Sequence, residues 1–206
     1  MKVISCDEKT GIQALERKTT SMKPGQIERQ DPTYIRHGTQ CLIANFEVAT
    51  GKMITPTIGN TRTEEDFRNH IYNSIQTAPQ AKWIFIVDQL NTHQSESLVR
   101  LVAKECELKN DLGIKGEEGI LESMETRAIF LSDPSHRIQF VYTPKHASWL
   151  NQIEIWFSIL SNRLLKRLST TSTDELKQKI TNFIEFFNDR MARVFKWTYK
   201  GKVLHA

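Results

Sequence analysis

The chain contains 206 residues, of which 39% are hydrophobic and 25% are charged, and Gly and Pro are few. This composition excludes a disordered or collagen-like chain, and the length is enough for one enzyme-sized domain with a substantial core. The cysteines are too far apart for a zinc-binding pair or an even disulfide framework, so we expect reduced thiols at Cys6, Cys41 and Cys106. No apolar run reaches the length of a signal-peptide core or a membrane helix, which predicts a soluble, cytoplasmic protein with no membrane partner.

The positive charge is concentrated in the last third of the chain. The net charge is +4, but residues 141–206 carry 11 Lys and Arg against 5 Asp and Glu, whereas residues 1–140 carry 17 against 19. A cationic segment suits a phosphate backbone, although a basic face is often only a solvated surface. On charge alone, nucleic acid binding and a solvated surface are equal alternatives.

The first half of the chain predicts an antiparallel meander followed by a helix. Apolar runs predict three strands, at residues 2–7, 39–48 and 53–56. Residues 49–52, Ala-Thr-Gly-Lys, predict the turn between the second and third strands. Thr63 is suited to cap a helix whose first turn is acidic and whose apolar residues repeat every four positions.

The second half predicts strands and helices around an irregular segment. Residues 81–88 are almost continuously apolar, as a strand covered on both faces requires, and residues 137–142 alternate as a further strand. Helices are expected at about residues 95–104, at about 148–168, and after a capping box formed by Ser172 and Glu175. The segment 105–135 allows only a short helix at about 121–131. We expect one domain over residues 1–206, with 105–135 as an insertion.

Three carboxylates occupy positions that a two-metal nuclease needs. Asp7 and Asp88 each end an apolar strand, and Glu154 opens an amphipathic helix. A carboxylate at the end of a buried strand is held by a stiff element where it can reach a metal or a substrate. Taken singly, such an Asp is commonly a turn or cap residue, and such a Glu is a solvated charge. Together they indicate a cation site.

Three blocks of sequence around these carboxylates resemble the signature blocks of bacterial insertion-sequence transposases in the mariner superfamily. The blocks are Cys6 to Lys9 with Ile12 to Leu15; residues 87–93, VDQLNTH; and residues 142–157, YTPKHASWLNQIEIWF. The resemblance runs through nearly the whole chain, including Phe195 to Thr198. Three ordered blocks make it far more specific than a single motif.

The resemblance implies an α/β fold of the ribonuclease-H-like type, a mixed five-stranded sheet flanked by helices. It also implies that Asp7, Asp88 and Glu154 form the catalytic and metal-binding triad. In such enzymes the carboxylates bind two Mg²⁺ (or Mn²⁺) ions, and one site cleaves a phosphodiester and joins a DNA 3′-hydroxyl to a new strand. The implied partners are transposon ends and target DNA, and the need to act on two ends implies a homodimer.

The chain departs from the family pattern inside and after the blocks. Gln89 stands where many relatives have Asn directly after the second Asp. From Asp88 to Glu154 the gap is 66 positions, which is longer than is common in the superfamily, and the excess falls within 105–135. Arg167-Leu168-Ser169-Thr170 stands where relatives often have a basic residue followed by Gly-Ser-Phe. We expect these changes to alter an amide contact, an inter-strand insertion and a turn.

The start of the chain departs most from the pattern. Met1 lies six positions before Asp7, without the helix-turn-helix region that relatives use to recognise transposon ends. We expect end recognition to need a separate N-terminal DNA-binding chain, a frameshifted fusion or a longer natural protein. We expect this chain alone to bind DNA weakly and without sequence preference.

Several residues near the blocks are candidates for DNA contact. His93 can orient a phosphate or a water molecule, or it can cap the following helix, and Asn91 is similar. For Lys145 and His146, a phosphate contact and a solvated loop are equal alternatives. The basic end of the following helix also suits the helix dipole without any ligand. The candidate DNA contacts are Asn91, His93, Lys145, His146, Trp149, Asn151, Arg163, Lys166 and Arg167.

Two other functions are consistent with the same residues. A ribonuclease-H-like nuclease acting on RNA hybrids or DNA junctions uses the same carboxylate chemistry. A catalytically silent remnant, or a domesticated DNA-binding or dimerisation module, is the alternative outside enzymes. Joining of a 3′-hydroxyl end to target DNA favours the transposase, and a lack of metal binding favours the remnant.

Overall fold

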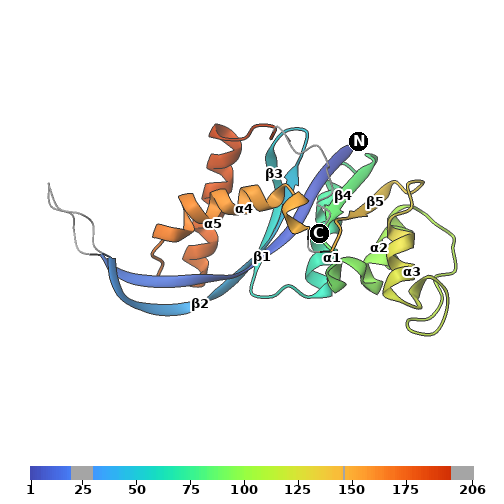
Figure 1. The fold of residues 1–206 in the computed structure, drawn as a ribbon, viewed down its shortest axis with the longest axis horizontal. Helices are drawn as coiled ribbons and strands as arrows, with labels where there is room; N and C mark the ends of the chain where they lie inside the picture. Colours follow the sequence, from blue (N-terminus) through green and yellow to red (C-terminus); the bar gives the residue numbers. More distant parts are fainter. Residues whose placement is uncertain (20–29, 146, 196–206) are drawn as a thin grey trace, which may run out of the picture.

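The computed structural model describes residues 1–19, 30–145 and 147–195, and a five-stranded mixed sheet lies at its centre (Figure 1). The strands are β1 (Lys2–Thr19), β2 (Gln30–Glu47), β3 (Lys52–Gly59), β4 (Trp83–Val87) and β5 (Ile138–Tyr142). Their order in the sheet is β3-β2-β1-β4-β5. The β1–β2 and β2–β3 pairs are antiparallel, which confirms the predicted meander, whereas β1–β4 and β4–β5 are parallel.

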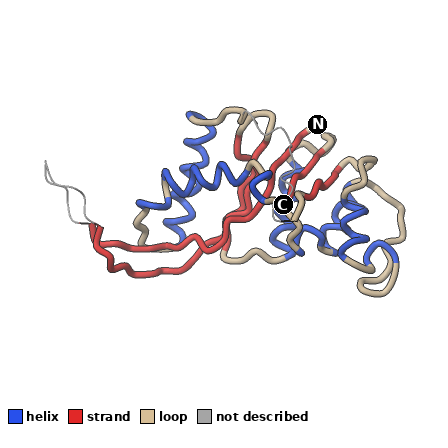
Figure 2. Tube along the Cα trace, in the orientation of Figure 1, coloured by secondary structure: helices blue, strands red, loops and turns tan. Residues whose placement is uncertain are grey.

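β1 and β2 are much longer than predicted. The expected end of β1 at Asp7 is wrong, because the strand continues to Thr19 and pairs with β2 along its length. The charged run after Asp7 suggested a strand end, but the chain passes it with a register shift between Lys9 and Ile12 and resumes pairing. Figure 2 shows the resulting two-stranded ribbon extending beyond the helices. Asp7 therefore lies inside β1, level with the end of the shorter β4.

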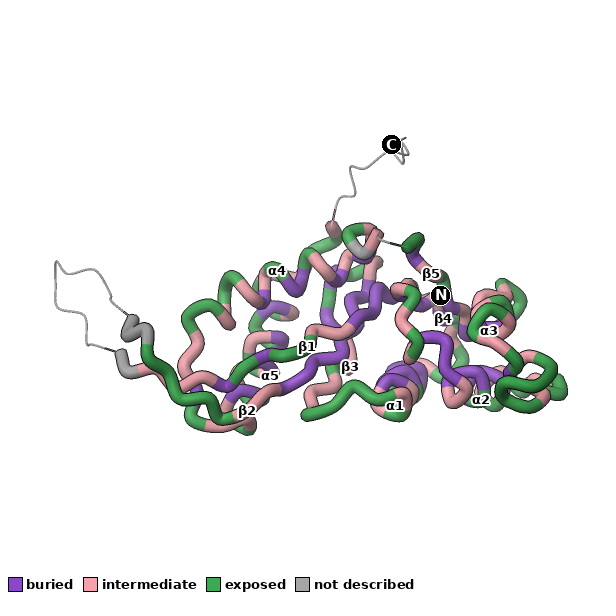
Figure 3. Tube along the Cα trace, turned by 60° about the horizontal axis from the view of Figure 1, so that its bottom comes forward, coloured by how far each residue is buried: buried purple, intermediate pink, exposed green. Residues whose placement is uncertain are grey.

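Helices cover both faces of the sheet and divide the core into two parts. On one face lie α1 (Glu64–Gln76), α2 (Glu96–Glu105) and α3 (Met124–Leu131), which pack on residues such as Ile4 and Phe85. On the other face lie α4 (Ile153–Arg163) and α5 (Thr173–Arg190), which pack on residues such as Ala44 and Phe46. Figure 3 shows the buried backbone running through the middle of the sheet. Within the described part of the chain, no helix combines the length and apolarity needed to cross a bilayer.

The single long helix expected at 148–168 is wrong. The structure has three pieces there: a 3-10 turn at Ser148–Leu150, helix α4, and a second 3-10 turn at Leu165–Arg167. The first break coincides with a tertiary contact, because the side chain of Asn151 bonds Ser5 and the Cys6 carbonyl of β1. The apolar period of the sequence could not show this break, since the residues on both sides of it fit one helical stripe.

Two smaller predictions need adjustment. Ser172 caps α5 as expected, by accepting a hydrogen bond from the Glu175 amide. The Glu175 carboxylate, however, accepts from the Thr171 amide and hydroxyl, one residue earlier than a standard capping box. In the segment 105–135, the short helix is present as α3, which begins at Met124 after a 3-10 turn at Gly119–Leu121 and a Ser123 cap.

Candidate active site

The register of the parallel β1–β4 pair brings Asp7 and Asp88 to the same place on the sheet. Ser5 pairs with Ile86, so Asp7, inside β1, and Asp88, the residue directly after β4, each lie two residues beyond this pair. The two carboxylates are close enough for the charge of Asp88 to raise the pKa of Asp7. Asp7 is buried, with 8% of its surface exposed, whereas 37% of the Asp88 side chain is exposed.

The start of α4 is tied to β1 immediately before Asp7. The Ser5 hydroxyl accepts a hydrogen bond from the Ile153 amide at 2.9 Å and also bonds the Asn151 side-chain oxygen. The Asn151 amide group donates to the Cys6 carbonyl at 3.0 Å. Glu154, in the first turn of α4, donates its backbone N–H to the Asn151 carbonyl at 3.1 Å. These bonds place the helix that carries Glu154 beside the strand that carries Asp7.

The two aspartates differ in their electrostatics. Burial, together with the negative charges of Asp88 and Glu8, raises the pKa of Asp7 to about 7, although the Glu8 amide bond and His93 act in the opposite direction. The hydrogen bond from His93 holds the pKa of Asp88 below its usual range despite partial burial. A neutral pH therefore leaves Asp88 ionised and Asp7 close to its midpoint.

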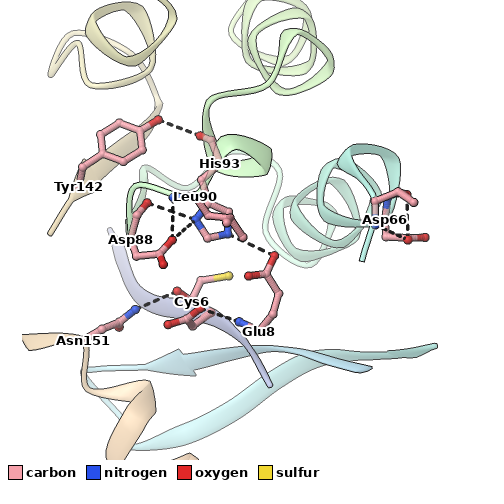
Figure 4. Close-up of polar contacts among 10 residues, drawn as sticks. Cys6, Glu8, Asp66, Asp88, Leu90, His93, Tyr142 and Asn151 are labelled. Carbon is pink, nitrogen blue, oxygen red and sulfur yellow. Dashed lines mark hydrogen bonds and ion pairs between the residues drawn. The ribbon is translucent and has the colours of Figure 1, made fainter. Parts of the chain in front are cut away.

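A buried histidine joins Asp88 to a second carboxylate, Glu8 (Figure 4). His93 Nδ1 lies 2.8 Å from Asp88 Oδ1, and His93 Nε2 lies 3.3 Å from Glu8 Oε1. Burial lowers the pKa of His93, but the bonds and charges of Asp88 and Glu8 outweigh it and raise the value to about 9. The ring is also packed against Phe67, with centroids 4.3 Å apart. His93 is therefore held as a cation between two carboxyl groups.

The burial of two residues disagrees with their prediction as DNA contacts. His93 and Asn151 both have 0% of their surface exposed, so neither side chain presents a surface to a bound duplex. Each instead bonds other parts of the site. Sequence alone could not reveal this, because the contacts that bury His93 and Asn151 come from residues far away in the chain, such as Glu8 and Ser5.

A hollow of about 870 Å³ opens beside Asp88, and it includes two of the predicted DNA contacts, Asn91 and Lys145. Its other walls come from η1 (Asn91–Gln94), from α3 within the 105–135 segment, and from the end of β5. Gln89, the residue that departs from the family pattern, donates its side-chain amide to the Thr143 carbonyl at 3.0 Å and so links the ends of β4 and β5. The hollow therefore borders the exposed side of Asp88.

The remaining predicted contacts lie on the surface or outside the described residues. Trp149 is 51% exposed, and Arg163, Lys166 and Arg167 are exposed along the end of α4 and the turn that follows. His146 lies outside the described residues. The exposed residues have the accessibility that a phosphate contact requires, and their role in DNA binding stays a prediction.

The predicted triad does not form a closed metal cluster. Among the residues that the structure describes, no group of three or more His, Cys, Asp and Glu side chains lies close enough to hold a metal ion. Asp7 and Asp88 are close enough for one charge to shift the pKa of the other. Glu154 is on the adjoining helix, tethered through Ser5 and Asn151.

Three polar residues with contacts in the candidate site were not predicted from the sequence as site residues. Glu8 is adjacent to Asp7 but points to the opposite face, where it meets His93. Ser5 anchors α4, and Tyr142 donates its hydroxyl hydrogen to the His93 carbonyl at 2.8 Å. A strand continuing past Asp7 would have predicted the direction of Glu8, whereas no sequence signal identifies the contacts of Ser5 and Tyr142.

A five-stranded mixed sheet of this order, with helices on both faces, is a ribonuclease-H-like α/β domain, and the predicted fold class is confirmed. The family model for DDE superfamily endonucleases matches residues 2–177, so the chain belongs to that family. The family-level resemblance seen in the sequence is therefore confirmed.

Solved structures of the Mos1 mariner transposase have a similar fold. The paired-end complex with Mn matches with a TM-score of 0.56 and 14% identity over 89% of this chain and 48% of that chain. A pre-cleavage Mos1 transpososome gives 0.57 and 13%, with the same coverage. The Mos1 strand transfer complex gives 0.55 and 14%, over 89% and 47%. This chain thus spans about half the length of the Mos1 chains. None of the curated proteins compared with this chain matches it.

Proposed function

We propose that this chain is the catalytic domain of a DNA transposase that cleaves phosphodiesters and transfers strands at transposon ends with the help of a divalent metal. The observation that carries the proposal is the β1–β4 register, which brings Asp7 and Asp88 level with each other at the end of β4 in a DDE-family fold. The tether from Ser5 and Asn151 supports the third role, because it places the helix of Glu154 beside the same strand.

The chemistry of the candidate triad, though not its present spacing, suits a hard divalent cation such as Mg²⁺ or Mn²⁺. Carboxylate oxygens are the ligands that these ions prefer. The like charge of Asp88 contributes to the raised pKa of Asp7, and a bound cation relieves such repulsion. Asp7, Asp88 and Glu154 are the residues that would hold it. When bound, the metal, most simply as two ions, activates the attacking hydroxyl and stabilises the leaving oxygen.

The protein's own groups prepare the site for this chemistry. Asp88 keeps its negative charge at neutral pH because His93 and the Leu90 amide donate to it. Asp7 provides a second carboxylate that ionises near neutral pH. Lys145 at the rim of the hollow supplies a positive charge where a phosphate would approach Asp88.

The partners that follow from this proposal are transposon-end DNA, target DNA and a second copy of the chain. The basic excess of residues 141–206 supports a phosphate-backbone partner. A homodimer follows from the need to process two transposon ends. A separate N-terminal DNA-binding chain is one possible means of recognising the DNA sequence of those ends.

A second candidate is a catalytically silent DNA-binding module. It is favoured by one observation, namely that the described acidic residues do not form a cluster able to hold a metal. Under this alternative the protein binds DNA and does not cleave it. A ribonuclease-H-like nuclease differs in cleaving without joining.

The test is a nicking and joining assay with the full chain, using supercoiled plasmid and a duplex with a free 3′-hydroxyl, in Mg²⁺, Mn²⁺ or EDTA. We expect metal-dependent nicking and covalent joining of the duplex to the plasmid. Asp88→Asn and Glu154→Gln should each reduce both rates at least about 100-fold without changing the fold, because only a charge-bearing ligand is lost. Glu185→Gln, an exposed carboxylate on α5, is the matched control and should act as the unmodified protein.

Each other outcome selects a different function. Nicking of RNA–DNA hybrids without joining assigns the chain to the nucleases. DNA binding with no nicking in either metal assigns it to the silent modules. Near-full activity in Asp88→Asn or Glu154→Gln rejects the triad.

A further inference from the structure

Glu8 is a buried carboxylate for which the proposed triad has no use. Only 2% of its side chain is exposed, and it lies on the face of β1 opposite to Asp7. Burying an isolated carboxylate is costly unless it is paired and hydrogen-bonded. Its ionic partner is His93, whose Nε2 lies 3.3 Å from Glu8 Oε1. The role of this buried pair therefore depends on the other contact of His93.

The other side of the His93 ring contacts Asp88. Nδ1 lies 2.8 Å from Asp88 Oδ1 and 3.2 Å from the Asp88 carbonyl oxygen, and both atoms are acceptors. A carboxylate oxygen accepts a hydrogen bond, so each of the two contacts is made through a hydrogen on the ring nitrogen involved. Glu8 and Asp88 thus fix the ring between two acceptors and set its orientation.

The surrounding structure leaves His93 little freedom to turn. Phe67 packs on the ring, with centroids 4.3 Å apart. The backbone of η1 is fixed from two sides, because Tyr142 donates to the His93 carbonyl at 2.8 Å and Arg127 donates to the Gln94 carbonyl at 2.7 Å. Arg127 belongs to α3, so the 105–135 segment helps to hold the histidine in place.

This arrangement fixes the Asp88 carboxylate. Its Oδ1 accepts from His93 Nδ1 and from the Leu90 amide at 3.0 Å, so two donors converge on one oxygen. Two directional bonds to Oδ1 define the plane of the carboxylate and leave Oδ2 to take another ligand. Groups that orient a ligating side chain in this way typically change metal affinity when they are removed.

We propose that Glu8 and His93 are a positioning pair that holds Asp88 in the orientation required to bind the catalytic cation, with Glu8 acting through His93. The proposal rests on the proposed function, because it assigns the pair to the same metal site. Neither residue touches the substrate or the metal. The pair differs from a purely structural ion pair in that its loss changes the affinity of a metal that neither residue contacts.

The test measures Mn²⁺ binding to the full chain by electron paramagnetic resonance, together with the Mn²⁺ concentration that gives half-maximal plasmid nicking. In Glu8→Gln and His93→Leu, we expect both values to rise about 10- to 100-fold. The double variant should be no weaker than His93→Leu alone, because Glu8 acts through the histidine. His93→Asn, which retains a donor near the Nδ1 position, should recover part of the loss.

The matched control is His136→Leu. His136 is also a buried histidine packed against a phenylalanine, 4.7 Å from Phe130, but it precedes β5 at the opposite end of the parallel strands from Asp88. We expect this control to lose stability without a change in Mn²⁺ affinity. The same loss of affinity in His136→Leu as in His93→Leu would show a general structural effect and overturn the positioning role.

The remaining outcomes separate this proposal from the proposed function. If the unmodified protein neither binds Mn²⁺ nor nicks DNA, the proposed function fails and the pair has no metal to serve. If the unmodified protein binds Mn²⁺ and nicks DNA, and if the folded Glu8→Gln variant does so at the same Mn²⁺ concentrations, the positioning role is wrong while the proposed function stands. If Glu8→Gln, His93→Leu and His93→Asn all fail to fold by circular dichroism, the pair serves folding alone and the proposal is overturned.

Discussion

At the scale of single residues, Asp7 and Asp88 show how position changes the chemistry of one residue type. The two lie level on neighbouring parallel strands, yet the pKa of Asp7 is raised to about 7 and the pKa of Asp88 is lowered. Burial dominates at Asp7, whereas the His93 hydrogen bond dominates at Asp88. The sequence singled out both aspartates but could not distinguish them, because the difference comes from the burial of Asp7 and from the contact of Asp88 with His93.

His70, a buried histidine on α1, predicts that the protein becomes less stable in mild acid. Burial lowers its pKa to about 3. Nδ1 bonds the Thr57 hydroxyl at 2.8 Å, and among the described residues the other ring nitrogen has no hydrogen-bond partner. The unfolded chain takes up a proton at its ordinary pKa of about 6.5, and the folded chain does not. Stability contributed by neutral His70 is therefore present above about pH 6.5 and is lost as the pH falls towards 3.

The measurement is urea unfolding of the unmodified protein and of His70→Gln at pH 7 and pH 5. Between these values we expect the free energy of unfolding to fall by about 2 kcal/mol more in the unmodified protein than in the variant. Glutamine can still bond Thr57 but does not titrate. The difference between the unmodified protein and the variant therefore isolates His70 from the other titrating groups, which the two proteins share. Equal losses in the two proteins would show that His70 is not the source of acid sensitivity.

At the scale of elements, the attachment of α4 to β1 decides whether Glu154 can serve the site. Asn151 is fully buried and bonds both the Ser5 side chain and the Cys6 carbonyl. We expect Asn151→Ala to destabilise the fold by about 1–3 kcal/mol, since it leaves buried polar groups without a partner. We also expect nicking to fall at least about 100-fold, because the start of α4 is released from the strand of Asp7.

Asn188 on α5 provides the control for this prediction. It makes a comparable pair of bonds to another strand, accepting from the Met53 amide at 2.8 Å and donating to the Met53 carbonyl at 2.7 Å. Asn188→Ala should cost similar stability and leave nicking at the temperature of the assay unchanged. Urea unfolding and the plasmid assay measure the two effects, and equal losses of activity in both variants would contradict the specific role of Asn151.

The elements also show where prediction from sequence ends. The α1 cap at Thr63, the α2 region and the strands β4 and β5 followed from local propensity and period, and each lies close to its expected bounds. The extension of β1 past Asp7 depends on β2 covering a charged run, and the break before α4 depends on Asn151 reaching β1. Both are tertiary contacts between residues far apart in the chain, which local sequence does not encode.

The same limit applies to the candidate site. Asp7, Asp88 and Glu154 were found because their sequence blocks carry them, but the polar residues around them were assigned by neighbourhood alone. His93 and Asn151 proved to be buried, whereas Lys145 and Asn91 border the hollow beside Asp88. Sequence context indicated the candidate site, and only the structure separated the residues that face solvent from those that are buried beside it.

At the scale of the whole molecule, the sheet separates two cores, and α4 and α5 lie together on one face. The last third of the chain, which includes both helices, also holds the basic excess. Arg163, Lys166 and Arg167 are exposed at the end of α4 and in the turn that follows it. A duplex bound along this region would release counterions from its phosphates, so its affinity should depend steeply on salt.

We therefore expect a variant with Arg163, Lys166 and Arg167 all changed to glutamine to bind a random duplex more weakly and with a smaller dependence on salt. If each residue contacts one phosphate, the slope of log K against log salt concentration should fall by about 3. Fluorescence anisotropy from 50 to 200 mM salt measures the slope. The matched control changes three exposed lysines in the acidic part of the chain to glutamine, namely Lys104, Lys109 and Lys115. Equal slopes for the two triple variants would mean that net charge alone attracts DNA and that the end of α4 is not a contact surface.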